Sequence, residues 1–197
     1  MGRRNLDNIE RKIIKQTIRL GALNGVDHIS TIELSEKLGI SEGTIFVHFK
    51  TKENLIFEAY RIASAYLKDT MYNDLIKAET FDDLFECWKK VVDLLFEKPN
   101  LARFLYNFFI SKYLIKFAFR HEEGEVRFIN KWLQKSGNHP VEDNLAMILW
   151  YDIYFSTLRY VMLDSNIEEL DKRDSFKYLA FQSSFARVFV QYKHSNE

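Results

Sequence analysis

The chain has 197 residues and carries 28 basic and 28 acidic side chains, so its formal net charge is zero. Hydrophobic residues make up 47% and charged residues 28%, which is typical of a globular protein. With 7 Gly and 2 Pro the sequence is neither collagen-like nor of low complexity. The single cysteine, Cys87, excludes an internal disulfide framework and a cysteine-ligated zinc site, and we expect it to be a small buried hydrophobe.

The longest uninterrupted apolar run is Leu145 to Tyr151. It is too short to cross a bilayer, which takes about 20 such residues. Arg3 and Arg4 open the chain without an apolar stretch behind them, so we expect no secretory signal and place the protein in the cytoplasm. The sequence predicts no cofactor and no metal site.

Apolar residues recur at helical spacing along almost the whole chain, and no stretch alternates long enough to predict a sheet. The fold class expected is therefore all-α. The segment 101–120 is apolar and aromatic, and its pattern does not fix where a helix breaks. Helices are predicted over residues 6–24, 31–38, 42–46, 52–77, 80–97, from Pro99 onward, 121–136, 140–164 and 171–193.

Helix boundaries carry capping residues. Ser30 and Glu33 form the pattern of a capping box, in which each side chain accepts from the backbone amide of the other. Gly25, Gly39 and Gly137 stand where helices should end, because glycine adopts the left-handed conformation of a C-terminal cap. The hydroxyl caps predicted for the later helices are Ser41, Thr51 and Thr80.

Residues 30–49 form two short predicted helices around the turn Leu38 to Ser41, which is the arrangement of a helix-turn-helix. The second helix leaves small and polar side chains outward, and such a helix can enter the major groove of DNA. The inner side is expected to bury Leu34, Leu38, Ile40 and Ile45 against Ile14 and Ile18, and the outer side to present Glu42, Gly43, Thr44 and His48.

Charge supports a division of the chain. Residues 1–54 carry a balance of +2 and residues 55–197 a balance of −2, while the first twenty residues alone carry +4. We therefore expect a DNA-binding domain at 1–54, with three helices including the helix-turn-helix, and a second, larger helical domain at 55–197. Arg3, Arg4, Arg11 and Lys12 are either a solvated basic face or an arm that reaches DNA.

The stretch from Gly25 to Leu55, and above all the block Gly39-Ile-Ser-x-Gly-Thr-x-Phe-x-His-Phe-x-x-Lys-Glu-x-Leu55, resembles the DNA-binding domain of the TetR family of transcriptional regulators. The detailed resemblance covers residues 6–60. It implies that Ser30 caps a helix near a phosphate, that His48 and Lys52 contact the DNA backbone, and that Gly43 and Thr44 lie near the groove floor. The residues that it assigns to the DNA surface are Ser30, Thr31, Ser41, Glu42, Gly43, Thr44, Phe46, His48 and Lys52.

Three of these positions leave alternatives open. Phe46 departs from the family, which usually has Tyr there, and its missing hydroxyl removes one phosphate contact. Glu42 either accepts a hydrogen bond from cytosine or only favours the start of its helix. His48 is either a DNA contact or a surface histidine.

The second half of the chain holds most of the aromatic residues. Helical bundles need such residues as core, but aromatic-lined cavities are also typical of small-molecule sites. The resemblance implies that residues 55–197 are a helical effector-binding and dimerisation domain with an effector pocket. A flat or aromatic, weakly charged ligand would fit the aromatic lining expected for it. The candidates for its lining are Phe104, Phe108, Tyr113, Trp150 and Tyr154.

The final helix has apolar residues on more than one side, which predicts burial against more than its own domain. Phe181, Phe185, Val188 and Tyr192 form one stripe, and Ala180, Ser183, Ser184 and Arg187 a face of smaller residues. A homodimer joined by two helices from each subunit satisfies this pattern, and the resemblance implies the same twofold arrangement. Its recognition helices would lie roughly 34–36 Å apart on a palindromic operator.

The function expected is a DNA-binding transcriptional regulator, in the first place a repressor that a small apolar or aromatic effector releases from double-stranded DNA; activation stays open. One alternative is a ligand-independent helical interaction protein with a vestigial DNA-binding domain. An enzyme is the other, but the usual catalytic motifs are missing. The cluster of His121, Glu122, Glu123 and Glu125 is explained better by a surface helix.

Overall fold

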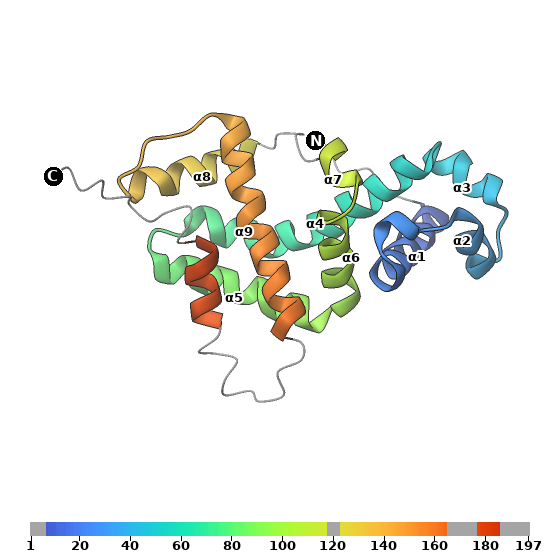
Figure 1. Ribbon diagram of the computed structural model, residues 1–197, viewed down its shortest axis with the longest axis horizontal. Helices are drawn as coiled ribbons and strands as arrows, with labels where there is room; N and C mark the ends of the chain where they lie inside the picture. Colours follow the sequence, from blue (N-terminus) through green and yellow to red (C-terminus); the bar gives the residue numbers. More distant parts are fainter. Residues whose placement is uncertain (1–6, 118–122, 165–176, 186–197) are drawn as a thin grey trace. The chain divides into compact units, whose positions relative to one another are not determined.

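The computed structural model describes residues 7–117, 123–164 and 177–185 (Figure 1). Every regular element in these ranges is helical, which confirms the all-α prediction. The elements are α1 (Asn8–Asn24), the 3₁₀ turn η1 (Val26–His28), α2 (Thr31–Leu38), α3 (Glu42–Phe49), α4 (Lys52–Lys77), α5 (Phe81–Glu97), α6 (Pro99–Phe109), α7 (Tyr113–Phe117), α8 (Glu123–Lys135) and α9 (Asp143–Asp164). Residues 177–185 form a further helical segment.

Helix α1 begins at Asn8 because Asp7 caps it. The Asp7 carboxylate accepts from the Glu10 amide at 2.8 Å, and the Glu10 carboxylate accepts from the Asp7 amide at 3.1 Å. This complete capping box is one that we did not predict. The helix ends at Gly25, whose φ of 86° confirms the predicted stop.

The hydroxyl caps of the next three helices are confirmed. Ser30 accepts from the Glu33 amide at 3.3 Å, and Ser41 and Thr51 each accept from an amide three residues ahead at 3.1 Å. The Glu33 carboxylate lies 3.6 Å from Lys37 Nζ. Gly39 ends α2 in the left-handed conformation, with φ of 63°, and α3 runs on to Phe49, beyond the end predicted from the sequence.

The chain forms two compact units, which we describe separately. Unit 1 consists of residues 1–70 and 95–117, and unit 2 of residues 71–94 and 118–197. Helices α4 and α5 each contribute residues to both. Within the described residues no helix is long and apolar enough to cross a membrane.

The core of unit 1 is built on the contact between α1 and α6 (Figure 1). The Phe104 ring of α6 lies fully buried over Gly21 of α1. Next to it, Asn107 donates from Nδ2 to the Gly21 carbonyl at 2.9 Å. Aromatic rings continue this core, since Tyr60 stacks on Phe108 with ring centroids 3.9 Å apart.

The break that the sequence left open within 101–120 lies between Phe109 and Tyr113. The Ser111 hydroxyl organises it, because it donates to the Phe108 carbonyl at 2.8 Å and accepts from the Tyr113 amide at 3.2 Å. This turn buries the Tyr113 side chain, and burial raises the pKa of its hydroxyl.

The described part of unit 2 packs α5, α8, α9 and the segment 177–185 together. Trp88 of α5 lies against Phe181, with ring centroids 5.8 Å apart. Cys87 is buried as predicted, which raises the pKa of its thiol. Lys131 of α8 donates to the Ala78 carbonyl at 3.0 Å and thereby fixes the loop before α5.

Candidate DNA-binding surface and effector cavity

The helix-turn-helix is held by apolar side chains at the centre of α2 and α3. Leu34 is 0% and Ile45 1% exposed, and Phe49 closes the same interior. Leu38 and Ile40 were also predicted to be buried, but they are only half-buried because they lie at the turn.

The polar residues predicted to face DNA at the start of α3 are bonded within the protein. Thr31 of α2 donates from its hydroxyl to the Glu42 carboxylate at 2.5 Å, which ties the two motif helices together. The Ser41 and Thr44 hydroxyls lie 2.9 Å apart and share a hydrogen bond. The role of Glu42 left open by the sequence therefore has a third answer, a link between α2 and α3.

The outward face of α3 carries Gly43, Phe46 and Val47. Phe46 is 36% and Val47 68% exposed, so Val47 protrudes most. The sequence analysis did not predict Val47 as a surface residue, because it assigned mainly polar side chains to the outward face of this helix. The signal was present, since Val47 lies opposite Ile45 and Phe49 on a helical projection.

His48 lies against the start of α1. Its Nδ1 is 3.5 Å from Glu10 Oε1 and 3.7 Å from Asp7 Oδ2. The ligand-type atoms of these three residues fall within 4.8 Å of one another, a spacing compatible with a divalent cation. The imidazole of His48 thus lies beside both carboxylates and links α3 to the start of α1.

The chain leaves α3 through a strained residue. Lys50 has φ of 65° without being glycine, and its Nζ donates to the Val47 carbonyl at 3.3 Å. Lys52 follows at the first position of α4, where its side chain is half-buried. A cation at this helix start is not explained by the helix dipole, which favours acidic groups there.

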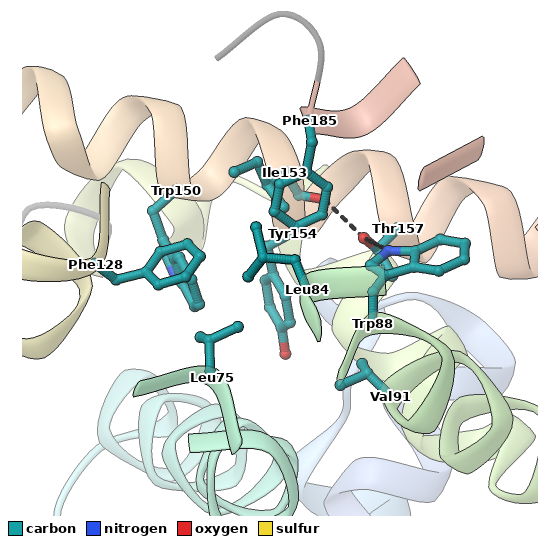
Figure 2. Close-up of a pocket in the computed structure, with 10 residues that line it drawn as sticks. All are labelled: Leu75, Leu84, Trp88, Val91, Phe128, Trp150, Ile153, Tyr154, Thr157 and Phe185. Atoms are coloured by element: carbon teal, nitrogen blue, oxygen red, sulfur yellow. Dashed lines mark hydrogen bonds between the residues drawn. The ribbon is translucent and has the colours of Figure 1, made fainter. Parts of the chain in front are cut away.

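Unit 2 contains a partly open apolar cavity (Figure 2), whose volume is about 30 Å³ as space for the centre of a water molecule and about 420 Å³ when the open solvent beside it is counted. Figure 2 shows the aromatic rings of Trp150 and Tyr154 from α9 reaching into it beside Phe128 of α8. Phe128 and Trp150 meet edge to face, with centroids 5.6 Å apart. The full lining is Leu75, Leu84, Trp88, Val91, Phe128, Trp150, Ile153, Tyr154, Thr157 and Phe185.

This lining contains no charged side chain. Thr157 accepts from Trp88 Nε1 at 2.9 Å and donates to the Ile153 carbonyl at 2.9 Å. The dashed line between Ile153 and Thr157 in Figure 2 marks the second of these bonds. The hydrogen-bonding capacity of both side chains is thus largely spent inside the protein. The cavity offers mainly apolar surface to a guest.

The five predicted pocket residues do not come together. Trp150 and Tyr154 line the cavity of unit 2. Phe104, Phe108 and Tyr113 belong to the core of unit 1, where they are 0%, 0% and 2% exposed. The sequence did not distinguish aromatic side chains that fill a core from those that border a cavity.

The predicted interface helices are described in part. Phe181 and Phe185 are buried within unit 2, together with Ser184, whereas Ser183 is exposed. The exposed apolar side chains of this region are Leu145, Ile148 and Leu163 of α9, and Tyr178 and Leu179 of the segment 177–185. Arg187, Val188 and Tyr192 lie outside the described residues.

The two described carboxylates of the cluster that was considered as a catalytic alternative, Glu123 and Glu125, differ in exposure. Glu123 is exposed and pairs with Arg127, but Glu125 is only 7% exposed. His121 and Glu122 lie outside the described residues.

Two motif helices joined by a glycine turn, with the second helix held by its inner face alone, define a helix-turn-helix DNA-binding protein. Residues 13–59 match the model of the bacterial regulatory proteins of the tetR family. Residues 13–59 are thus the DNA-binding domain of a TetR-family transcriptional regulator. The members to which it is similar are described as transcription regulators rather than enzymes.

A protein of Haemophilus influenzae, described as an uncharacterized HTH-type transcriptional regulator, is 27% identical over 96 residues, which are 48% of this chain and 51% of that protein. The match thus spans about half the length of that relative. Among solved structures, a TetR-family transcriptional regulator from the same organism aligns with a TM-score of 0.66 at 17% identity, over 93% of this chain and 100% of that one. FadR from Bacillus subtilis, solved with stearoyl-CoA, aligns with a TM-score of 0.60 at 17% identity, over 87% of this chain and 97% of FadR. These two likenesses concern the fold.

Proposed function

We propose that this protein is a homodimeric transcriptional repressor that binds a palindromic DNA operator through α3 and releases it when a small apolar effector occupies the cavity of unit 2. It acts in the cytoplasm, where the DNA is. The observation that carries the proposal is the α2–α3 motif, capped by Ser30 and Ser41, with one face of α3 left to solvent.

We assign DNA contact to the motif residues in two groups. Lys52, at the start of α4, and His48 face the backbone, whereas Gly43 and Thr44 lie on the helix that enters the groove. Residues 1–54 are the DNA-binding part in function, even though the compact unit that contains them is larger.

Selection from a random DNA library tests this part. An enriched palindrome supports a dimeric sequence-specific regulator. Lys52→Ala should weaken binding to all DNA and flatten its salt dependence, because one fewer phosphate is neutralised. Thr44→Ala should change sequence preference modestly. Equal behaviour of the two variants contradicts this sorting of contacts.

The effector is expected to be uncharged where it enters the cavity, since no charged residue lines that space. FadR, a relative in fold, was solved with stearoyl-CoA, so an acyl chain is one class to test and a neutral aromatic compound the other. The cavity involves Leu75 of α4 and Val91 of α5, and α4 is the helix that begins beside α3. A ligand that prefers the conformer with wrongly spaced α3 helices releases the DNA, with a coupling of about 1–3 kcal/mol.

Titration of the protein with stearoyl-CoA and with neutral aromatic compounds, with and without operator DNA, tests the coupling. Effector and operator should weaken each other by the same factor, because coupling is reciprocal. Val91→Phe should fill the cavity and abolish ligand binding, whereas Ile115→Phe, at a side chain 77% exposed, should change nothing. Unchanged operator affinity at saturating ligand contradicts the proposal.

The dimer is proposed from the exposed apolar residues of α9 and of the segment 177–185. Ile148 is 47% and Leu179 60% exposed, and apolar helix faces of this kind need a partner. Sedimentation of Ile148→Glu and Leu179→Glu should show monomers, while Ile115→Glu stays dimeric. A wild-type protein that sediments as a monomer contradicts the proposed dimer.

A further inference from the structure

The exposed edge of α3 consists of Gly43, Phe46 and Val47, and we call these residues the reading edge. At 3.6 residues per turn, Val47 stands about 160° around the helix from both Ile45 and Phe49. Those two residues are 1% and 3% exposed and fix the inner side of the helix, whereas Val47 is 68% exposed. Val47 is therefore the side chain that any surface facing α3 meets first.

The polar neighbours of the reading edge have partners within the protein. The Glu42 carboxylate accepts from Thr31, and the Thr44 hydroxyl is 2.9 Å from the Ser41 hydroxyl. For these groups to read a base they must share or break those bonds. The carbon surface of Val47 faces solvent without any such rearrangement.

Gly43 adds an independent observation. A Cβ built on it would meet only Ser41 Oγ, at an ordinary 3.6 Å, and its φ is not in the left-handed region. Neither packing nor backbone conformation of the free protein thus requires glycine at this second residue of α3, and alanine is the better helix former. Gly43 lies one turn before Val47 and has no side chain, so a partner surface can approach the backbone of α3 closely at that point.

We infer that Val47, flanked by Phe46, reads the C5-methyl group of a thymine in the major groove. This inference rests on the DNA binding proposed above. Thymine presents a methyl group in the major groove that no other unmodified base pair offers, and apolar side chains recognise it by contact. The valine methyls supply such carbon surface without a hydrogen-bonding group. Each half of the operator should therefore contain one thymine that is recognised through its methyl group.

The test uses the sequence selected from the random library as the probe. Each thymine is replaced in turn, in both half-sites, by deoxyuridine, which deletes the methyl group and keeps every hydrogen-bonding atom. Burial of one methyl group corresponds to about a fourfold change in affinity per half-site, and about sixteenfold for the pair. One thymine position should show this loss with the wild-type protein.

Val47→Ala identifies the side chain responsible. It should bind the thymine operator more weakly than the wild type. For this variant, the Kd for the operator with deoxyuridine at the sensitive position should exceed the Kd for the thymine operator by less than about twofold. Lys52→Ala is the matched control, since it should weaken binding to both operators and leave the ratio unchanged. Circular dichroism checks that Val47→Ala folds, which its exposure predicts.

The outcomes distinguish a failure of thymine recognition by Val47 from a failure of DNA binding. An enriched operator without any uracil-sensitive thymine, or with equal sensitivity in the wild type and Val47→Ala, overturns the reading by Val47 and leaves DNA binding standing. A library without enrichment, together with no retention of DNA at low salt, overturns the proposed function and this inference with it.

Discussion

Replacing Gly21 by alanine tests the packing of α1 on α6. A Cβ at this position would lie 2.7 and 2.9 Å from two ring carbons of Phe104, and 3.2 Å from Ile29 Cδ1. Real side chains avoid carbon contacts this short, so something must shift. The Phe104 ring is 0% exposed and has no solvent to move into, so the helices themselves must separate.

The magnitude follows from two opposing terms. Overpacking of a filled core costs about 1–3 kcal/mol, and the short distances to a fully buried ring favour the upper part of that range. Alanine regains up to about 1 kcal/mol of helix propensity over glycine. We therefore expect Gly21→Ala to lose about 1–2 kcal/mol of unfolding free energy, which lowers the Tm by about 2–8 °C for a chain of this size.

Thermal and urea unfolding, followed by circular dichroism, measure this loss. Gly43→Ala is the matched control, because its Cβ meets only Ser41 Oγ at 3.6 Å. That variant should be as stable as the wild type or more so, yet bind DNA more weakly. If Gly21→Ala unfolds at the same temperature as the wild type, the close contact of α1 with Phe104 does not exist as described.

Three further outcomes follow from individual contacts. Thr157→Val should cost about 1–3 kcal/mol in urea unfolding, because it leaves the buried Nε1 of Trp88 without its acceptor; wild-type stability would show that the bond contributes nothing. Asn107→Ala removes the bond to the last turn of α1 and should cost about 0.5–1.5 kcal/mol in the same assay, which an unchanged urea midpoint would refute. Hydrogen bonds from Lys135 and Lys131 lower the pKa of Glu79 below its ordinary 4.5, so its stabilising contribution is present above pH 4.5 and is lost as the pH falls through the lowered pKa. Glu79→Gln should therefore have a lower Tm than the wild type at pH 7, and the difference should shrink below pH 4.5; a gap that stays constant to pH 3 contradicts this.

The local features of the motif region were predictable from the sequence because they depend on neighbours along the chain. Ser30, Ser41 and Thr51 each cap a helix as their position before an apolar pattern predicts, and Gly39 ends α2. Caps and glycine stops depend on bonds that span three or four residues. Such bonds can be read directly from spacing.

The contacts that the sequence did not reveal join residues far apart in the chain. The sequence placed Phe104 and Trp150 in one candidate pocket, but only the folded chain shows that Phe104 fills the space over Gly21 while Trp150 borders a cavity. In the same way, the motif placed His48 at the DNA, whereas its nearest charged partner, Glu10, comes from the start of α1. Neither pairing leaves a signal in local spacing.

The composition of the cavity limits how an effector can act. No charged group lines it, so under the proposed mechanism apolar burial is the main source from which a ligand could gain its preference for one conformer. A coupling of about 1–3 kcal/mol corresponds, at about 25 cal/mol per Å², to roughly 40–120 Å² of additional apolar surface buried in the favoured state. An aromatic side chain buries 150–250 Å² in full, so the partial covering of one ring is enough. Trp150 and Tyr154 are half-buried and lie on the cavity. In the proposed mechanism, a modest change in how a ligand covers these two rings would be enough to supply the whole coupling energy.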